Sequence, residues 1–206
     1  MADPQRLSPK LRQSIAAQIG ERLPQDAALT PAALVVAEAA PPHALGASLR
    51  VMMLPLDRLR RAKGAMARRI VRTGRWHHQI CTGKSATGFA SSVTESSAAN
   101  APHQVVEVAR SAVPAALQAS IDWVDANIPE RARADVLTVP AYHLTGLWLH
   151  GREIDAVVIA SMPTRLKGLA LNTRIESADF LSMLAENAPV TGAGMLDAMN
   201  RDGETQ

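Results

Sequence analysis

The sequence predicts an α+β fold: a mostly antiparallel sheet of about five to seven strands with helices packed on it. Two observations lead to this prediction. Apolar residues recur at helical spacing near both ends of the chain and twice in its middle, whereas the other apolar segments are short and end at turn residues, as strands do. At 206 residues, the chain is long enough to bury one hydrophobic core.

We expect a single globular domain over residues 1–200, followed by a frayed tail over 201–206. The domain divides into an N-terminal helical part (8–42), a sheet-rich part (48–163) and a C-terminal helical part (177–200). Hydrophobic residues make up 47% of the chain and charged residues 20%, which is typical of globular domains and not of disordered chains.

The chain shows no sign of secretion or membrane insertion. Its single cysteine, Cys81, has no partner for an internal disulfide, and the first ten residues lack the apolar segment of a secretory signal. No stretch approaches the roughly 18 apolar residues that span a bilayer. These features predict a cytoplasmic protein of a bacterial-type cytosol, with no transmembrane segment and no disulfide.

The N-terminal part begins with a helix over residues 9–24. Ser8 can cap this helix, and Pro9 suits its first position. The apolar residues at helical spacing are Leu11, Ile15, Ile19 and Leu23. A second start signal at Thr30 and Pro31 predicts a short buried helix over 32–40.

Residues 49–56 predict a strand that a proline ends. The next segment, residues 57–72, predicts a basic amphipathic helix, because Asp57 can cap it and Gly74 can provide a left-handed exit. The residues of its apolar face are Leu59, Ala62, Met66 and Ile70.

A hairpin follows, with strands at 75–82 and 85–93 joined by a turn at Gly83–Lys84. A further strand at 104–108 leads into a helix over 111–128.

The most apolar part of the chain predicts three consecutive antiparallel strands, at 135–140, 142–150 and 154–162. The C-terminal part predicts a helix from Ser177 and a weaker one near residues 195–199.

One nucleophile lies near a base in the sequence. Alternation along the predicted strand places His77 on the side of Cys81 and His78 on the opposite side. Cys81 with His77 is therefore the candidate pair for a cysteine-dependent hydrolase or transferase. A cysteine inside a strand is, however, more often a buried apolar residue.

No cofactor or metal is predicted. The triplet Gly83–Lys84–Ser85 lacks the glycine that a phosphate-binding loop needs five residues earlier, where His78 stands, so we interpret it as a hairpin turn. His77 and His78 point to opposite sides of a strand and cannot hold one ion together.

Basic residues gather in one segment. The segment from Asp57 to Lys84 contains nine basic residues and one acidic residue, Asp57. The candidates for binding an anion or a charged partner are Arg58, Arg61, Arg68, Arg69, Arg72, Arg75 and Lys84. Nucleic acid is one candidate partner of the basic helix 58–75, although the aromatic residues of stacking platforms are missing there. A solvated face packed over the sheet is the favoured interpretation.

Tyr142 and Trp148 are candidate interface residues, because large amphipathic rings often anchor protein contacts. Their position beside the most apolar strands also fits a role in the core.

Three hypotheses about function follow. The leading one is a non-enzymatic interaction or assembly protein with a protein partner or as a homo-oligomer. The alternatives are an enzyme that uses Cys81 with His77 and a nucleic-acid-binding accessory protein that uses the basic helix.

Overall fold

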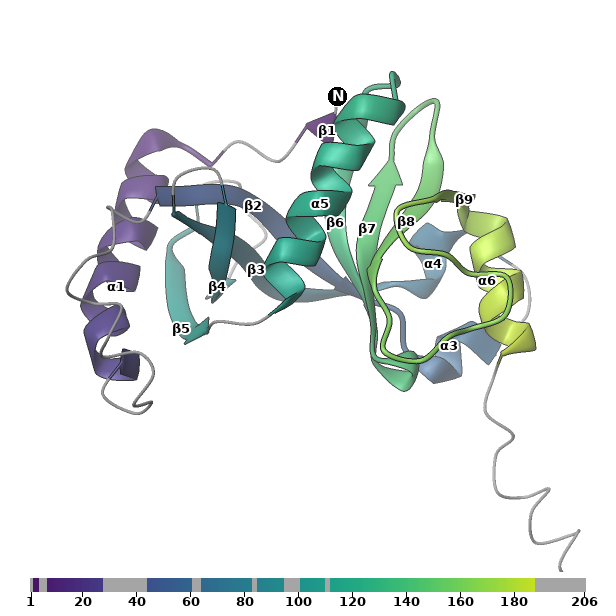
Figure 1. The fold of residues 1–206 in the computed structure, drawn as a ribbon, viewed down its shortest axis with the longest axis horizontal. Coiled ribbons are helices and arrows are strands. Elements are labelled where there is room, and N and C mark those ends of the chain that lie inside the picture. Colours follow the sequence, from purple (N-terminus) through teal and green to yellow (C-terminus); the bar gives the residue numbers. More distant parts are fainter. Residues whose placement is uncertain are drawn as a thin grey trace, which may run out of the picture.

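The computed structural model describes residues 2–3, 7–27, 44–60, 64–82, 85–94, 101–109 and 112–187 (Figure 1). Its strands are β1 (Ala2–Asp3), β2 (Ala44–Met53), β3 (Val71–Thr82), β4 (Ser85–Thr94), β5 (His103–Ala109), β6 (Ala132–Val139), β7 (Leu144–His150), β8 (Asp155–Ser161) and β9 (Arg174–Glu176). Its helices are α1 (Pro9–Ala27), α3 (Leu56–Arg60), α4 (Met66–Arg69), α5 (Ala112–Asn127) and α6 (Ser177–Glu186), with a 3₁₀ turn, η1, at Pro140–Tyr142.

These strands form one sheet in the order β5-β4-β3-β2-β6-β7-β8-β9, with β1 beside β6. Most neighbours are antiparallel, but β2 pairs with β6 in parallel, from Val51↔Val136 to Met53↔Thr138. The two-residue β1 is also parallel to β6. The predicted α+β class with a mostly antiparallel sheet is confirmed. The sheet has more strands than expected because β1 and β9 are too short to show an alternating pattern.

Alternation along β6 separates the two faces of the sheet. Ala134 and Val136 pack with apolar residues of β7 and β8 on the face that α5 covers. Leu137 and Val139 point the other way and join a second cluster with α3, α4 and α6. The centre of the sheet is therefore buried on both sides.

The face opposite α5 is covered by two separate groups of helices. α1 lies at one end, where Leu11, Ile15 and Ile19 pack against Trp76 and neighbouring strand residues. The other end carries α3, α4 and α6, which pack near β8 and β9 (Figure 1). Among the residues that the structure describes, no long helix lies over the middle strands of this face, between the two groups.

The predicted start of the first helix is confirmed. The backbone N–H of Leu11 donates a hydrogen bond to Ser8 Oγ at 3.4 Å, and Pro9 opens the helix. The helix continues past the expected stop at Pro24 to Ala27. The second predicted helix, 32–40, lies outside the described residues.

The single basic helix predicted over 57–72 is wrong. Two short helices, α3 and α4, stand in its place, and the chain leaves α4 at Ile70 with an extended ψ of 152°. Gly64, between the two helices, has φ +148°, which a helix interior does not accommodate. Arg72 and Arg75 belong to β3.

Gly74 adopts a positive φ of +70°, but within a strand and not at a helix end. The pairing of β2 with β3 shifts register between Arg50↔Trp76 and Met52↔Arg72, so extra residues of β3 bulge out around Gly74. The predicted left-handed conformation of Gly74 is thus confirmed, but its predicted place at the end of a helix is wrong.

The hairpin strands, the strand at 104–108, the helix over 111–128 and the helix from Ser177 are confirmed as β3, β4, β5, α5 and α6. Of the three consecutive strands, the first starts earlier, at Ala132, and Tyr142 lies in η1 before the second. His143 follows η1 with φ +49°, which turns the chain into β7. The turn at 83–84 and the weak helix near 195–199 lie outside the described residues.

No helix in the described ranges is long and apolar enough to cross a membrane. The central pairing of β2 with β6 joins the strands on either side of it into one sheet. The elements thus form a single α+β domain.

Candidate functional site

A cavity of about 330 Å³ lies on the face of the sheet opposite α5; we call it the basic pocket. Its walls come from β2, β3, β6, β7 and the short helix α4. The residues that line it are Arg50, Met52, Ala67, Ile70, Arg72, Arg133, Asp135, Trp148 and His150. It therefore sits near the middle of the sheet, where none of the described long helices covers the strands.

The strand register explains how residues distant in sequence meet there. On β6 and β7, Arg133 pairs with His150 and Asp135 pairs with Trp148. Both pairs lie on the same face of the sheet, because residues two apart on a strand point to the same side. The parallel pairing of β2 with β6 then brings Arg50 alongside this hairpin.

Three arginines from three different strands contribute positive charge to the basic pocket. The guanidinium of Arg50 lies over the ring of Trp76, 5.3 Å from its centre, in a cation–π contact. Arg72 and Arg133 are exposed, and neither guanidinium makes a hydrogen bond or ion pair with any residue that the structure describes. Three positive charges lining one cavity of about 330 Å³ attract an anion to it.

Asp135 is the one acidic residue among the described residues that line the basic pocket, and its carboxylate already has a partner. Its side chain is only 4% exposed, and Oδ2 lies 2.9 Å from Nε2 of His150. An ionised carboxylate only accepts hydrogen bonds, so this contact places the proton of the imidazole on Nε2. The imidazole also stacks on Trp148, with ring centres 4.0 Å apart.

Trp148 is itself fixed from its other side. Its Nε1–H donates to Asp155 Oδ1 at 2.8 Å, and the Ser177 hydroxyl donates to the same oxygen at 2.6 Å. This chain of contacts connects β7, β8 and the start of α6. The floor of the basic pocket is therefore preorganised, because its ring positions are set by hydrogen bonds behind it.

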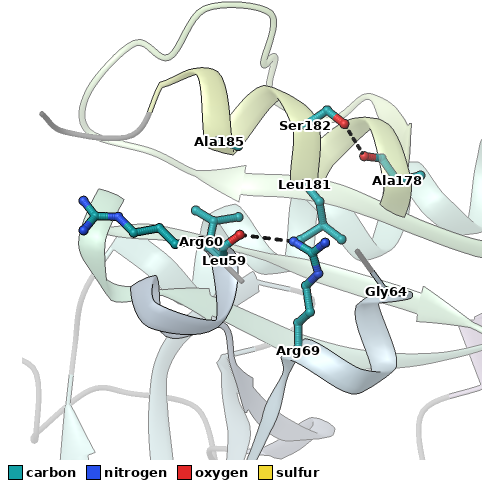
Figure 2. A pocket seen from close by; sticks show the side chains of 8 residues that line it. All are labelled: Leu59, Arg60, Gly64, Arg69, Ala178, Leu181, Ser182 and Ala185. Atoms are coloured by element: carbon teal, nitrogen blue, oxygen red, sulfur yellow. Dashed lines mark hydrogen bonds between the residues drawn. The ribbon is translucent and has the colours of Figure 1, made fainter. Parts of the chain in front are cut away.

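A second cavity, of about 520 Å³, lies between α6 and the two short helices α3 and α4 (Figure 2). Arg69 donates from Nη1 to the carbonyl of Leu59 at 3.2 Å. The Ser182 hydroxyl donates to the carbonyl of Ala178, and both hydrogen bonds are drawn in Figure 2. Most of the remaining lining is small and apolar. This second cavity is large enough for a small molecule, but few of the residues that line it carry polar groups that could select a ligand.

Five of the seven basic residues predicted to bind an anion lie in the described part of the chain, and they are spread over different environments. Arg58 and Arg69 donate to the carbonyls of Ile70 and Leu59, so both stabilise the α3–α4 connection. Arg68 and Arg75 are exposed outside the basic pocket. Arg72 lines it, whereas Arg61 and Lys84 lie outside the described residues.

Sequence reasoning missed Arg50, Arg133, Asp135 and His150. One local signal was present: Arg133 and Asp135 alternate on one strand, as Trp148 and His150 do on the next. Alternating polar residues inside two otherwise apolar strands indicate a polar spot on one face of the sheet.

Cys81 and His77 are not brought together. They stand four residues apart on β3, which corresponds to about 13 Å along a strand. Burial raises the pKa of the Cys81 thiol, which disfavours the reactive thiolate. Burial also lowers the pKa of His77 to about 4, and its ring stacks on Phe89 with centres 5.1 Å apart. The pair has neither the distance nor the charge states of a catalytic dyad.

A chain of hydrogen bonds crosses four strands on the α1 side of the sheet. His78 contacts Ser48 Oγ through Nδ1 at 2.9 Å and Ser92 Oγ through Nε2 at 2.7 Å. Ser92 Oγ also lies 2.8 Å from Nδ1 of His103. Burial, reinforced by His103, His77 and Arg12, lowers the pKa of His78 to about 3. Both imidazoles are thus neutral near pH 7, and every hydroxyl in the chain has a partner.

Tyr142 and Trp148 do not form the exposed interface that their amphipathic rings indicated. Both are buried, at 7% and 5% exposure, and the Tyr142 hydroxyl donates to the carbonyl of Leu184 at 2.7 Å. As a correction, Tyr142 is a core residue, and Trp148 supports the floor of the basic pocket.

Within the described ranges, no three His, Cys, Asp or Glu side chains are grouped as ligands for one metal ion. Comparisons of the chain with protein-family models, with curated proteins and with solved structures find no match. The candidate function therefore depends on the basic pocket alone.

Proposed function

We propose that the protein is a non-enzymatic binding protein that recognises a small anionic ligand in the basic pocket. The observation that carries this proposal is the meeting of Arg50, Arg72 and Arg133 at one cavity. The three arginines come from three different strands, yet all of them line the same cavity. An anion among them would relieve their mutual repulsion.

Two further features support binding by this pocket. The first is size, since a cavity of about 330 Å³ lies at the lower end of the range for small-molecule sites. The second is order, because the floor is held by the Asp135–His150 contact and by Trp148. A binding role is favoured over cysteine catalysis because Cys81 and His77 are separated along β3.

Isothermal titration calorimetry with three anions of similar shape tests the proposal: phenyl phosphate, benzenesulfonate and benzoate. We expect at least one of them to bind the wild type. Arg72→Gln and Arg133→Gln should each weaken that binding by about tenfold or more, because each removes a charge-assisted hydrogen bond.

Arg68→Gln is the matched control, since Arg68 is an exposed arginine on α4 that does not line the basic pocket. It should leave the affinity within about twofold of the wild type. If all three variants weaken binding equally, the anion is attracted by net charge and the pocket is not the site. If no probe binds, the proposal is wrong.

A further inference from the structure

The three guanidinium groups restrict the chemical class of the ligand. Each presents a planar fork of N–H donors, and each comes from a different strand. A carboxylate has two oxygens and suits one or two such forks. A phosphate monoester has three terminal oxygens and up to two negative charges, so it can engage all three arginines.

Asp135 limits where negative charge can lie. Its buried carboxylate contacts Nε2 of His150, at the floor of the cavity. A second anionic group directed at this floor would meet a like charge in a poorly solvated place. The ligand should therefore carry one anionic head and no second acid at its other end.

The rest of the lining favours an apolar body. Met52 is buried, Ile70 is half-buried, and Ala67 is exposed on α4 beside them. Burying an apolar group against these side chains stabilises a complex through the hydrophobic effect. Because the cavity is small, the apolar group must be compact, of the size of one ring or a short branched chain.

We infer that the ligand of the basic pocket is a phosphate monoester carrying one compact apolar group. This inference rests on the proposed function. The phosphate lies among Arg50, Arg72 and Arg133, and the apolar group contacts Met52, Ala67 and Ile70.

The ranking of the calorimetric probes tests the phosphate. Phenyl phosphate, with three terminal oxygens and two charges, should bind on the order of tenfold more tightly than benzoate. Benzenesulfonate, with three oxygens and one charge, should lie between them. If benzoate binds as tightly as phenyl phosphate, the phosphate class is overturned while the anion-binding function stands. If none of the three binds, both proposals are wrong.

Ala67→Trp tests the apolar side. Its indole would fill the wall where the ring of phenyl phosphate lies but leave the arginines in place. Affinity for phenyl phosphate should fall by about tenfold, while affinity for inorganic phosphate changes by less than about twofold.

Ala65→Trp is the matched control, because Ala65 is exposed next to α4 but does not line the pocket. It should leave both affinities unchanged. Equal weakening by both tryptophan variants, or equal loss of both phosphates in Ala67→Trp, would overturn the assigned position of the apolar group.

Discussion

Gly146 is a residue whose side chain the sheet has no space to accept. A Cβ atom built there would lie 2.7 Å from the carbonyl oxygen of Val158 and 3.3 Å from Cα of Ile159. Both obstacles are backbone atoms of β8, so no side chain can rotate away to make room. We expect Gly146→Ala to lower the free energy of unfolding by about 1–3 kcal/mol in urea denaturation, through overpacking.

Gly20 provides the matched comparison. It lies inside α1, and a Cβ atom built there meets nothing within 4 Å. Gly20→Ala should raise the free energy of unfolding by about 0.5–1 kcal/mol, because alanine loses less backbone freedom in a helix. If Gly146→Ala is as stable as the wild type, β7 and β8 do not approach as closely as described.

The candidate site could be predicted from the sequence only in part, and the reason is visible at this scale. Cys81 and His77 are conspicuous because their residue types are reactive. A catalytic pair, however, needs its side chains within hydrogen-bond distance, and four residues along a strand separate these two too far. Arg50 and Arg133 are inconspicuous because they stand 83 positions apart, and their meeting depends on which strands pair. Residue type alone therefore pointed to the less well supported site.

Among the elements, α1 interacts with edge strand β5 through one side-chain amide. Gln18 donates from Nε2 to the carbonyl of His103 at 2.9 Å and accepts from the N–H of Val105 at 2.9 Å. These two backbone groups lie on the edge of β5, because β5 ends the strand order. The amide of Gln18 thus makes the hydrogen bonds that a neighbouring strand would make with these two groups. Because the two groups are occupied, they are not open to pairing with a strand of another chain.

Removing this amide should loosen the helix from the sheet edge. We expect Gln18→Ala to lower the free energy of unfolding by about 1–2 kcal/mol and to speed hydrogen exchange at the Val105 amide, which loses its acceptor. Gln13→Ala, at an exposed position of the same helix, should change neither quantity. Slow exchange at Val105 in Gln18→Ala would show that this hydrogen bond does not protect the edge.

The existence and type of most described elements could be read from periodicity, since α1, α5, α6 and the central strands carry strong patterns. The basic segment is the exception. Its apolar positions fit one helix, but Gly64 interrupts the helical backbone with φ +148°. The β-branched residue Val71 starts strand β3, although the predicted helix extended to residue 72. The spacing of apolar residues indicates which side chains are buried. It is the same whether Gly64 continues the helix or interrupts it with a positive φ, so the spacing alone could not reveal the interruption.

For the whole molecule, the decisive feature is the parallel pairing of β2 with β6. The chain makes the β3–β4–β5 meander and then α5 before β6 returns beside β2. Such a crossover has no local sequence signal, because nothing near either strand records its distant neighbour. The basic pocket exists only because of this pairing, so its residues could be recognised after the topology and not before.

The sheet as a whole should be sensitive to acid. His77 and His78 are buried on its two faces, and burial lowers their pKa values to about 4 and about 3, from 6.5. Since the unfolded chain takes up protons first as the pH falls, stability present above pH 6.5 is lost progressively toward the folded pKa values. Between pH 7 and pH 5, each histidine should contribute a loss of about 2 kcal/mol, measured by urea denaturation at both values.

His77→Phe separates the two histidines. The Nε2 atom of His77 is buried and has no hydrogen-bond partner, and its ring stacks on Phe89, so phenylalanine can keep the shape and the stacking without titrating. We expect this variant to lose about 2 kcal/mol less stability than the wild type between pH 7 and pH 5, while His78, held between Ser48 and Ser92, and the partly buried His103 keep their contributions. If the variant and the wild type lose equal stability between pH 7 and pH 5, His77 is protonated in the folded protein, and the face beneath α5 is open enough to water to accept the charge.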